Sequence, residues 1–315
     1  MATINDVAKT SGLSVGTVSR YINGAKLKQS NMEAIEEAIK KLGYRTNGIA
    51  RSMKTGKSLL IAIIVPSLAN MFSMRVIESM ERVLETENYS VLVSDCLGDP
   101  VKEIEKMTLL YEKMVDGFVL MPTSKNALHI KEIIGDKPLV LIDRTMDEPI
   151  FDSVTIDNRD AAYRLVKSAL LAGVKKIGMI EGPQNLFTAR ERSLGFEKAL
   201  EEFHIETNYR KQAGYDVASG YETMQEWMEA DLEAVFASNY EQTVGAMNAL
   251  YDAKKKMRII GFDSLELAYF TNQTYDYISQ PVEEIGVHAA KLLLERIKNP
   301  DKKIENIIVQ AYEKV

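Results

Sequence analysis

Apolar residues near the start of the chain recur every three or four positions, a spacing typical of short amphipathic helices. Thr3 followed by Asp6 has the spacing of a capping box and predicts the start of a first helix. Gly12 can adopt the left-handed backbone of a tight turn, and Ser14 predicts the cap of a second helix. Val18, midway along that second helix, can pack against the first. The pattern predicts a helix-turn-helix pair.

A third helix is predicted further along the same segment. Ser30 with Glu33 again has the capping-box spacing. An apolar face then runs from Ile35 to Leu42, and Gly43 is suited to end the helix. Because each of the three helices has an apolar face, we expect them to share one small core.

The pattern changes after this segment. Residues 47–58 are basic and weakly amphipathic, which predicts a linker or a marginal helix that needs a partner to fold. From residue 59 onward, apolar runs alternate with amphipathic patterns, which predicts βαβ units, and their number favours two α/β subdomains with a cleft between them. The expected strands are residues 59–65, 90–94, 117–121, 139–143, 176–181, 234–238 and 258–262, and the expected helices are residues 74–87, 101–113, 159–172, 190–203, 220–229 and 241–252.

The charge of the chain is divided unevenly along its length. The 315 residues carry a net charge of −6, which by itself argues against a nucleic-acid partner. Residues 1–57, however, hold ten basic and four acidic side chains, a charge of +6, so the remaining chain carries −12. A basic head on an acidic body predicts that only the head contacts phosphate. The alternative is a solvated basic face that has no partner.

The sequence carries few signs of secretion or membrane insertion. The longest apolar run, residues 59–65, is strand-sized and much shorter than a membrane span. The first residues lack the basic and apolar regions of a signal peptide. Cys96 is the only cysteine, so an intrachain disulfide cannot form. We therefore expect a cytoplasmic protein, associated with the nucleoid through DNA, that makes no membrane contact.

Motifs that suggest catalysis or cofactor binding lack a residue or a spacing that the chemistry requires. Residues 55–58 resemble the end of a phosphate-binding loop, but Arg51 stands where its first glycine belongs. The three histidines, His129, His204 and His288, lack the spacing of metal ligands. We therefore expect no catalytic residues, no metal site and no cofactor, and we predict that the protein is not an enzyme.

Three stretches, residues 3–8, 12–24 and 42–45, resemble the DNA-binding headpiece of the lactose-repressor (LacI/GalR) family. Residues 47–57 resemble the hinge of that family, and the resemblance covers nearly the whole chain. It implies a ligand-responsive transcription regulator that binds a pseudo-palindromic operator in double-stranded DNA as a homodimer. A small molecule in the cleft of the body would modulate the affinity for the operator.

The resemblance also implies a division of the chain into parts. An all-α helix-turn-helix headpiece is followed by a hinge and by an α/β body. The body would consist of two Rossmann-like, parallel-sheet subdomains of the periplasmic-binding-protein type, with crossings near Asp157, Pro281 and Lys302. The parts are a headpiece at residues 1–46, a hinge at 47–58 and an effector-binding and dimerisation body at 59–315, with an N-subdomain of about 59–157 and 281–302 and a C-subdomain of about 158–280 and 303–315.

In the headpiece, the resemblance implies that the start of the second helix reads bases. Arg20 can bind guanine bidentately, whereas Gly16 carries no side chain where the family usually has one, which leaves the operator sequence open. In the hinge, Met53 stands where the family inserts a leucine into the minor groove. The implied DNA-binding residues are Thr3, Ser14, Val15, Gly16, Thr17, Ser19, Arg20, Asn23, Tyr44, Asn47, Ala50, Met53 and Lys54.

In the body, the resemblance implies an effector site at the cleft. Asp143 and Arg144 lie at the end of an expected strand, and strand ends face the cleft in open α/β sheets. Phe72 and Tyr240 can stack on a sugar ring. The alternative is that Asp143 and Arg144 form a structural ion pair. The implied effector-binding residues are Asn70, Phe72, Asp143, Arg144, Arg192, Asn239, Tyr240, Asp263 and Gln280.

The effector class is open among a sugar, a sugar acid and a sugar phosphate. Residues 141–144, 154–159 and 17–24 also resemble ketogluconate-type regulators, which favours a sugar acid weakly. We predict a repressor of carbohydrate or sugar-acid utilisation genes. Two other classes stay open, a sugar-binding protein without a role in DNA regulation and a sugar-modifying enzyme.

Overall fold

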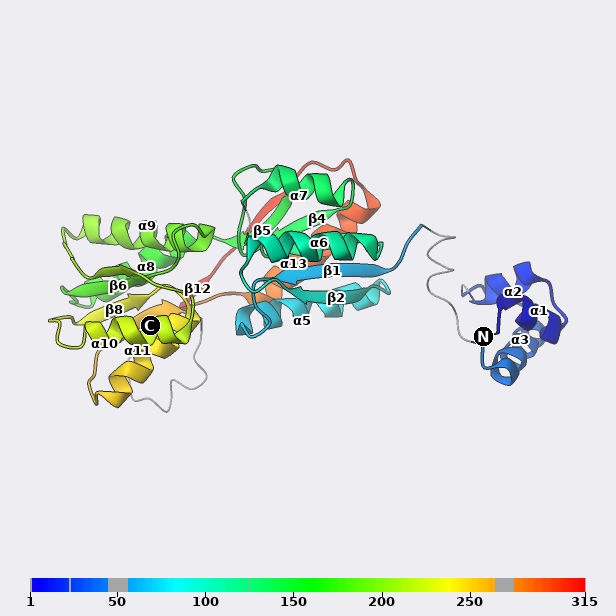
Figure 1. The fold of residues 1–315 in the computed structure, drawn as a ribbon, viewed down its shortest axis with the longest axis horizontal. Helices are drawn as coiled ribbons and strands as arrows, with labels where there is room; N and C mark the ends of the chain where they lie inside the picture. The colour runs from blue at the N-terminus through cyan, green and yellow to red at the C-terminus, as the bar shows by residue number, and fades with distance from the viewer. Residues whose placement is uncertain (1, 23, 45–55, 124, 264–274, 315) are drawn as a thin grey trace. The chain divides into compact units, whose positions relative to one another are not determined.

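The computed structural model describes residues 2–22, 24–44, 56–123, 125–263 and 275–314. These residues form two compact units, Met1–Leu59 and Leu60–Val315. Figure 1 shows their elements, and each unit is described by itself.

The first unit is a three-helix headpiece around one small core. Val7, Val18 and Ile35 are fully buried at its centre. The predicted capping box is confirmed, because the Thr3 hydroxyl accepts from the amide of Asp6 while the Asp6 carboxylate accepts from the amide of Thr3. The helices are α1 (Ile4–Ser11), α2 (Val15–Ile22) and α3 (Gln29–Leu42).

The start of α3 differs from the prediction. The helix begins one residue before Ser30, and no side chain caps it. Glu33 instead accepts a hydrogen bond from the side-chain amide of Gln29 at 3.0 Å. Because that carboxylate is bound to a side chain one turn away, the capping box predicted at Ser30 and Glu33 is wrong.

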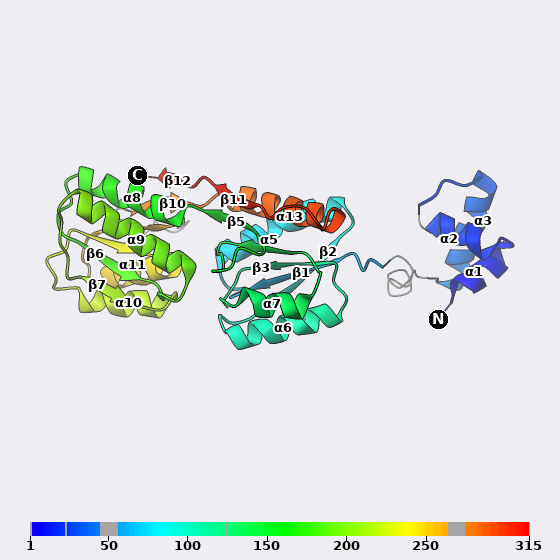
Figure 2. The ribbon, with the colours of Figure 1, turned by 90° about the horizontal axis from the view of Figure 1, so that it is seen from above.

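The second unit begins with an N-subdomain built on a parallel six-stranded sheet in the order β11-β5-β4-β3-β1-β2. Helices α5 and α13 cover one face and α6 and α7 the other (Figure 2). Because both faces are covered, its central strands are apolar throughout. The elements are β1 (Leu60–Val65), α5 (Met71–Thr86), β2 (Ser90–Asp95), α6 (Pro100–Glu112), β3 (Gly117–Leu120), α7 (Ala127–Ile134), β4 (Leu139–Ile142), β5 (Asp152–Ile156), α13 (Val282–Lys298) and β11 (Asn306–Val309).

The C-subdomain repeats this plan with the order β12-β10-β9-β8-β6-β7. Helices α8 and α9 pack together, as do α10 and α11, on opposite faces of the sheet (Figures 1 and 2). Strand β12 is antiparallel to β10, and the other pairings are parallel. The elements are α8 (Asn158–Leu171), β6 (Ile177–Glu181), α9 (Phe187–Glu202), β7 (Arg210–Gln212), α10 (Val217–Glu226), β8 (Ala234–Ala237), α11 (Tyr240–Asp252), β9 (Arg258–Phe262), β10 (Tyr275–Ser279) and β12 (Tyr312–Lys314).

The chain passes between the subdomains after β5, after β10 and between β11 and β12. The last crossing therefore follows Val309, and the prediction that the chain crosses near Lys302, with residues 303–315 in the C-subdomain, is wrong for residues 303–309. Asn306–Val309 pairs in parallel with β5. Arg296 fixes this segment, because its guanidinium binds the carbonyl oxygens of Lys302 and Lys303.

The predicted fold class, a helical headpiece followed by two parallel-sheet subdomains, is confirmed. Among the described residues, the elements not predicted from the sequence are α7, α13, β5, β7, β10, β11 and β12. No helix among the described residues is both long and apolar enough to span a membrane.

Candidate functional site: an interdomain cleft and an exposed reading helix

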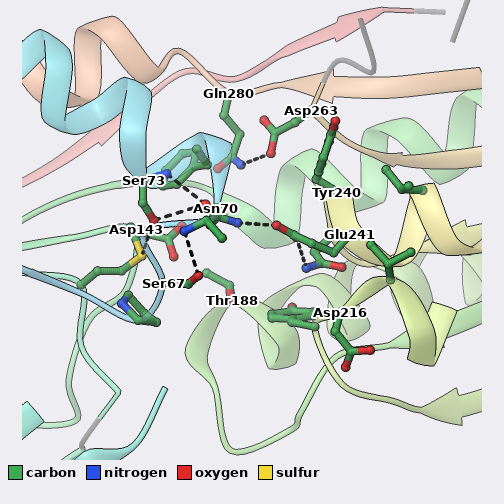
Figure 3. A pocket seen from close by; sticks show the side chains of 18 of the residues that line it. Ser67, Asn70, Ser73, Asp143, Thr188, Asp216, Tyr240, Glu241, Asp263 and Gln280 are labelled. Atoms are coloured by element: carbon green, nitrogen blue, oxygen red, sulfur yellow. Dashed lines mark hydrogen bonds between the residues drawn. The ribbon is translucent and has the colours of Figure 1, made fainter. Parts of the chain in front are cut away.

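A cavity of about 840 Å³ lies between the two subdomains (Figure 3). Loops after the strands of both sheets line it, together with the first turns of α5 and α11. All nine residues that the sequence analysis implied for effector binding lie in its wall: Asn70, Phe72, Asp143, Arg144, Arg192, Asn239, Tyr240, Asp263 and Gln280.

Asp143 and Asp263 occupy equivalent places in the two halves of the cavity. Asp143 follows β4 and Asp263 follows β9, the fourth strand of each subdomain in chain order. Both have left-handed backbones, with φ of 66° and 68°. The amide of Asp143 donates to Val154 O at 3.1 Å, and that of Asp263 to Ile278 O at 2.7 Å. These bonds to the neighbouring strand hold a non-glycine residue in an unfavourable conformation, which is common where a side chain must be aimed at a site.

The carboxyl group of Asp263 is strongly perturbed. Part of the side chain reaches solvent within the cavity, but the walls enclose it. Burial raises its pKa from an ordinary value of 3.8 to about 6, against the opposing charge of Arg192 and a hydrogen bond from Gln280 Nε2 at 2.9 Å. The negative charge of Asp143 adds to the rise in the pKa. The group therefore titrates close to neutral pH.

Arg192 is held rigidly in the wall of the C-subdomain. Its Nε donates to Asn158 Oδ1 at 2.8 Å and its Nη1 to Ser238 O at 2.6 Å. The guanidinium carbon lies 3.6 Å from the centre of the Phe262 ring, a cation–π geometry. Three of its contacts are thus to protein, and Nη2 has no hydrogen bond to the described part of the chain.

Asp143 and Arg144 form an ion pair while also lining the cavity. Arg144 Nε lies 3.2 Å from Asp143 Oδ2, and both side chains are about nine-tenths buried. Arg144 Nη1 also donates to Pro122 O at 3.2 Å. The structural ion pair that the sequence analysis kept as an alternative is therefore present, at the wall of the cavity rather than away from it.

Several cavity residues were not predicted from the sequence, among them Tyr215, Asp216, Thr188 and Glu241. Tyr215 Oη and Gln280 Oε1 are buried polar atoms that have no hydrogen-bond partner within the described residues. Asp216 could have been found from its capping pattern, since it accepts from the amide of Ser219 at the start of α10. Glu241 directly follows the implied Asn239 and Tyr240, whereas no motif in the sequence marks Tyr215 or Thr188.

The headpiece presents the predicted reading residues on the outer face of α2. Val18 is buried, whereas Val15, Gly16 and Arg20 are exposed. Ser14 Oγ accepts from the amide of Thr17 at 3.1 Å, and the two hydroxyls lie 2.9 Å apart. Of the other implied residues, Thr3 caps α1, and Ser19 and Tyr44 are partly buried, while Asn23, Asn47, Ala50, Met53 and Lys54 lie outside the described residues.

Comparison with known proteins identifies the family. A family model described as bacterial regulatory proteins, lacI family, matches residues 3–47, and one described as periplasmic binding protein domain matches residues 61–301. The HTH-type transcriptional repressor PurR of Haemophilus influenzae (strain PittEE) is 31% identical over 318 residues, covering 97% of this chain and 94% of that protein. The chain belongs to the LacI family. The regulator thus combines a LacI-type headpiece with a periplasmic-binding-protein-like body.

Solved structures agree with this assignment. The lac repressor dimer bound to operator and the anti-inducer ONPF has a TM-score of 0.89 at 22% identity, over 100% of this chain and 98% of that one, and shares the fold. A LacI family regulator from Enterococcus faecium with bound ribose has a TM-score of 0.74 at 26% identity, over 81% of this chain and 97% of that one.

The function predicted from the sequence is confirmed at the level of the family. The relatives are transcription regulators rather than enzymes, and the regulator is a DNA-binding protein with a ligand-binding body. LacI-family regulators bind operator DNA as dimers and respond to small-molecule effectors.

Proposed function

We propose that the regulator represses carbohydrate-utilisation genes and that its effector is a neutral, polyhydroxylated molecule of the sugar class. The main support for a neutral effector is the charge of the cavity wall. Its described residues include four carboxylates, on Asp143, Asp216, Glu241 and Asp263, but only two guanidinium groups. A cavity with this excess of carboxylates suits hydroxyl donors and repels an anion.

Neither arginine is available to neutralise an anionic ligand fully. Arg144 is paired with Asp143, and Arg192 directs two of its nitrogens to Asn158 and the carbonyl of Ser238. Of the Arg192 nitrogens, only Nη2 has no such contact within the described part of the chain, so a carboxylate or phosphate bound bidentately would also need Nε or Nη1, which already donate to the protein. A sugar acid or a sugar phosphate, both of which the sequence left open, is therefore disfavoured as the effector.

The polar atoms without partners fit the same class of ligand. Tyr215 Oη can donate and Gln280 Oε1 can accept. Hydroxyl groups both donate and accept, so a polyol can satisfy both atoms without leaving a buried polar group unpaired. The rings of Phe72 and Tyr240 line the same cavity and offer faces for the C–H groups of a sugar ring. The ribose bound to the Enterococcus faecium relative belongs to this class.

Binding in the cleft would be coupled to binding of the operator. A ligand that touches both subdomains stabilises one arrangement of them, and the effect on operator affinity is reciprocal. Two headpieces on one dimer raise the local concentration of the second head at a pseudo-palindromic site. We place this action in the cytoplasm, and we expect the ligand to release the operator.

Titration calorimetry of the full chain tests the effector class. The ligand panel should contain neutral pentoses and hexoses, matching sugar acids and matching sugar phosphates. We expect heat of binding from at least one neutral sugar and none from its acid or phosphate. Binding confined to the anionic sugars would overturn the proposed class.

Fluorescence anisotropy with an operator recovered by genomic footprinting tests the role in DNA binding. Arg20→Ala should lower affinity for that operator about ten-fold or more relative to shuffled DNA, because a bidentate base contact contributes about 1–3 kcal/mol. Lys9→Ala is the matched control, since it removes a headpiece charge outside α2. An unchanged preference for the operator in Arg20→Ala would contradict the assignment of α2 as the reading helix.

A further inference from the structure

Glu241, which the sequence analysis did not single out, lies between the two subdomains (Figure 3). Its Oε1 accepts from Asn70 Nδ2 at 2.7 Å, and its Oε2 accepts from Asn239 Nδ2 at 2.6 Å. Asn70 belongs to the N-subdomain and Asn239 to the C-subdomain. One carboxylate therefore joins side chains from the two walls of the cleft.

Each of the two asparagines is also the N-cap of a helix. Asn70 Oδ1 accepts from the amide and hydroxyl of Ser73 at the start of α5, and Asn239 Oδ1 accepts from the amide of Gln242 at the start of α11. Because each Oδ1 is occupied by the helix, each Nδ2 must point away from it. The caps thus fix both amino groups in the orientation that meets Glu241.

The position also suits a negative charge. The amino ends of α5 and α11 both lie at this carboxylate, and helix amino ends carry partial positive charge. Both hydrogen bonds have an ionised acceptor, which makes them stronger than bonds between neutral groups. The contact combines two fixed donors with one charged acceptor.

We propose that Glu241, Asn70 and Asn239 form a latch that holds the two subdomains in the arrangement that the structure shows. All three residues line the cavity. A ligand whose hydroxyls donate to Glu241 therefore competes with Asn70 for the same oxygen, and binding exchanges a protein–protein bond across the cleft for a protein–ligand bond. The latch deepens the proposed function, because it lies in the wall where the effector is expected to bind.

The sharpest variant removes the latch but keeps the helix cap. Asn70→Ser retains a hydroxyl that can cap α5 and loses the amino group that reaches Glu241. Glu241→Ala removes the acceptor from the other side. Asn126→Ser is the matched control, because Asn126 caps α7 by accepting from the amide of His129 and does not line the cavity.

Distances between spin labels on the two subdomains report on the latch without ligand or DNA. The labels replace exposed side chains, Leu128 on α7 and Leu171 on α8, in a full chain in which the buried Cys96 is changed to Ser. Labelled chain is mixed with an excess of unlabelled chain so that each dimer carries one labelled copy. Circular dichroism confirms that every variant is folded.

We expect one narrow distance distribution for the parent and for Asn126→Ser. In Asn70→Ser and in Glu241→Ala, the ratio of molecules at the parent distance to molecules at all other distances should fall about ten-fold or more. The double variant should change no further, because both substitutions remove one shared bond. Unchanged distributions in both single variants, or effects that add in the double variant, would overturn the latch.

The outcomes also separate the latch from the effector class. A changed distribution in a protein that binds no neutral sugar would support the latch and reject the class of effector. Binding of a neutral sugar by a protein whose distribution is insensitive to both substitutions would reject the latch and support the class.

Discussion

At the residue scale, two aspartates of the cavity, Asp143 and Asp263, combine a left-handed backbone with a carboxyl group enclosed by protein. Asp143 and Asp263 are non-glycine residues with positive φ, held by bonds to the next strand of each sheet. Both carboxylates line the same cavity. Enclosure by the cavity wall raises the pKa of Asp263, because a carboxylate enclosed by protein is less well solvated than one in water.

The titration of Asp263 gives the regulator a pH-dependent stability. Its pKa is about 6 in the folded chain and about 3.8 when unfolded, so folding favours the protonated form. The free energy of unfolding should therefore fall as pH rises from about 4 to 7, by on the order of 2 kcal/mol from this group. Asp263→Asn removes the titration, so its stability relative to the parent should increase across that range.

Urea unfolding at several pH values measures this difference. Asp136→Asn serves as the control, since it removes a carboxylate that is fully exposed rather than enclosed by a cavity wall. A constant difference between Asp263→Asn and the parent would show that Asp263 does not titrate in this range.

At the element scale, polar residues inside the N-subdomain explain both a missed strand and its stability. Strand β5 contains Asp152, Ser153 and Thr155, which the sequence pattern reads as exposed but which are all buried. Asp152 accepts two bonds from Arg296, each of 2.8 Å, and one from the amide of Glu305 at 2.8 Å. The buried charge is therefore paired, and it ties β5 to the segment that leads into β11.

Removal of this buried partner should destabilise the N-subdomain. Asp152→Ala leaves the guanidinium of Arg296 buried without its carboxylate, which should lower the free energy of unfolding by about 3 kcal/mol. Asp136→Ala removes an exposed carboxylate that lies 3.9 Å from Lys131 and should cause no measurable change. Equal effects of the two substitutions in urea unfolding would contradict the role given to Asp152.

The elements that could be predicted are those whose pattern is local. Central strands such as β1 are continuous apolar runs, and the caps at Thr3 and Ser14 lie three residues from their partners. Strand β7 has only three residues, all polar, and the pairing of β11 with β5 joins segments about 150 residues apart. The cavity residues were identified through family resemblance, whereas the Asn70–Glu241 bond, 171 residues apart in sequence, had no local signal.

At the scale of the whole molecule, opposite charges are segregated into separate units. The headpiece unit carries a net charge of +6 and the body a net charge of −12. Phosphate contacts release counterions from DNA, whereas a neutral ligand in the cleft releases none. The two binding activities should therefore respond differently to salt.

We expect operator affinity to fall by at least about ten-fold between roughly 50 and 200 mM KCl, while affinity for a neutral effector changes by less than about two-fold. Anisotropy and calorimetry at matched salt concentrations measure the two responses. A steep salt dependence of effector binding would point to an anionic effector, and salt-insensitive operator binding would contradict phosphate recognition by the headpiece.

The last crossing of the chain has a genetic consequence. Strands β11 and β12 are separated by only two residues, and they form the outer strand of the first and of the second sheet. A premature stop codon just before Asn306 would therefore remove an edge from both subdomains at once. Loss of both strands would expose β5 and β10 as new edges that can pair with other chains, so the allele is expected to yield an aggregating protein rather than one impaired in a single subdomain.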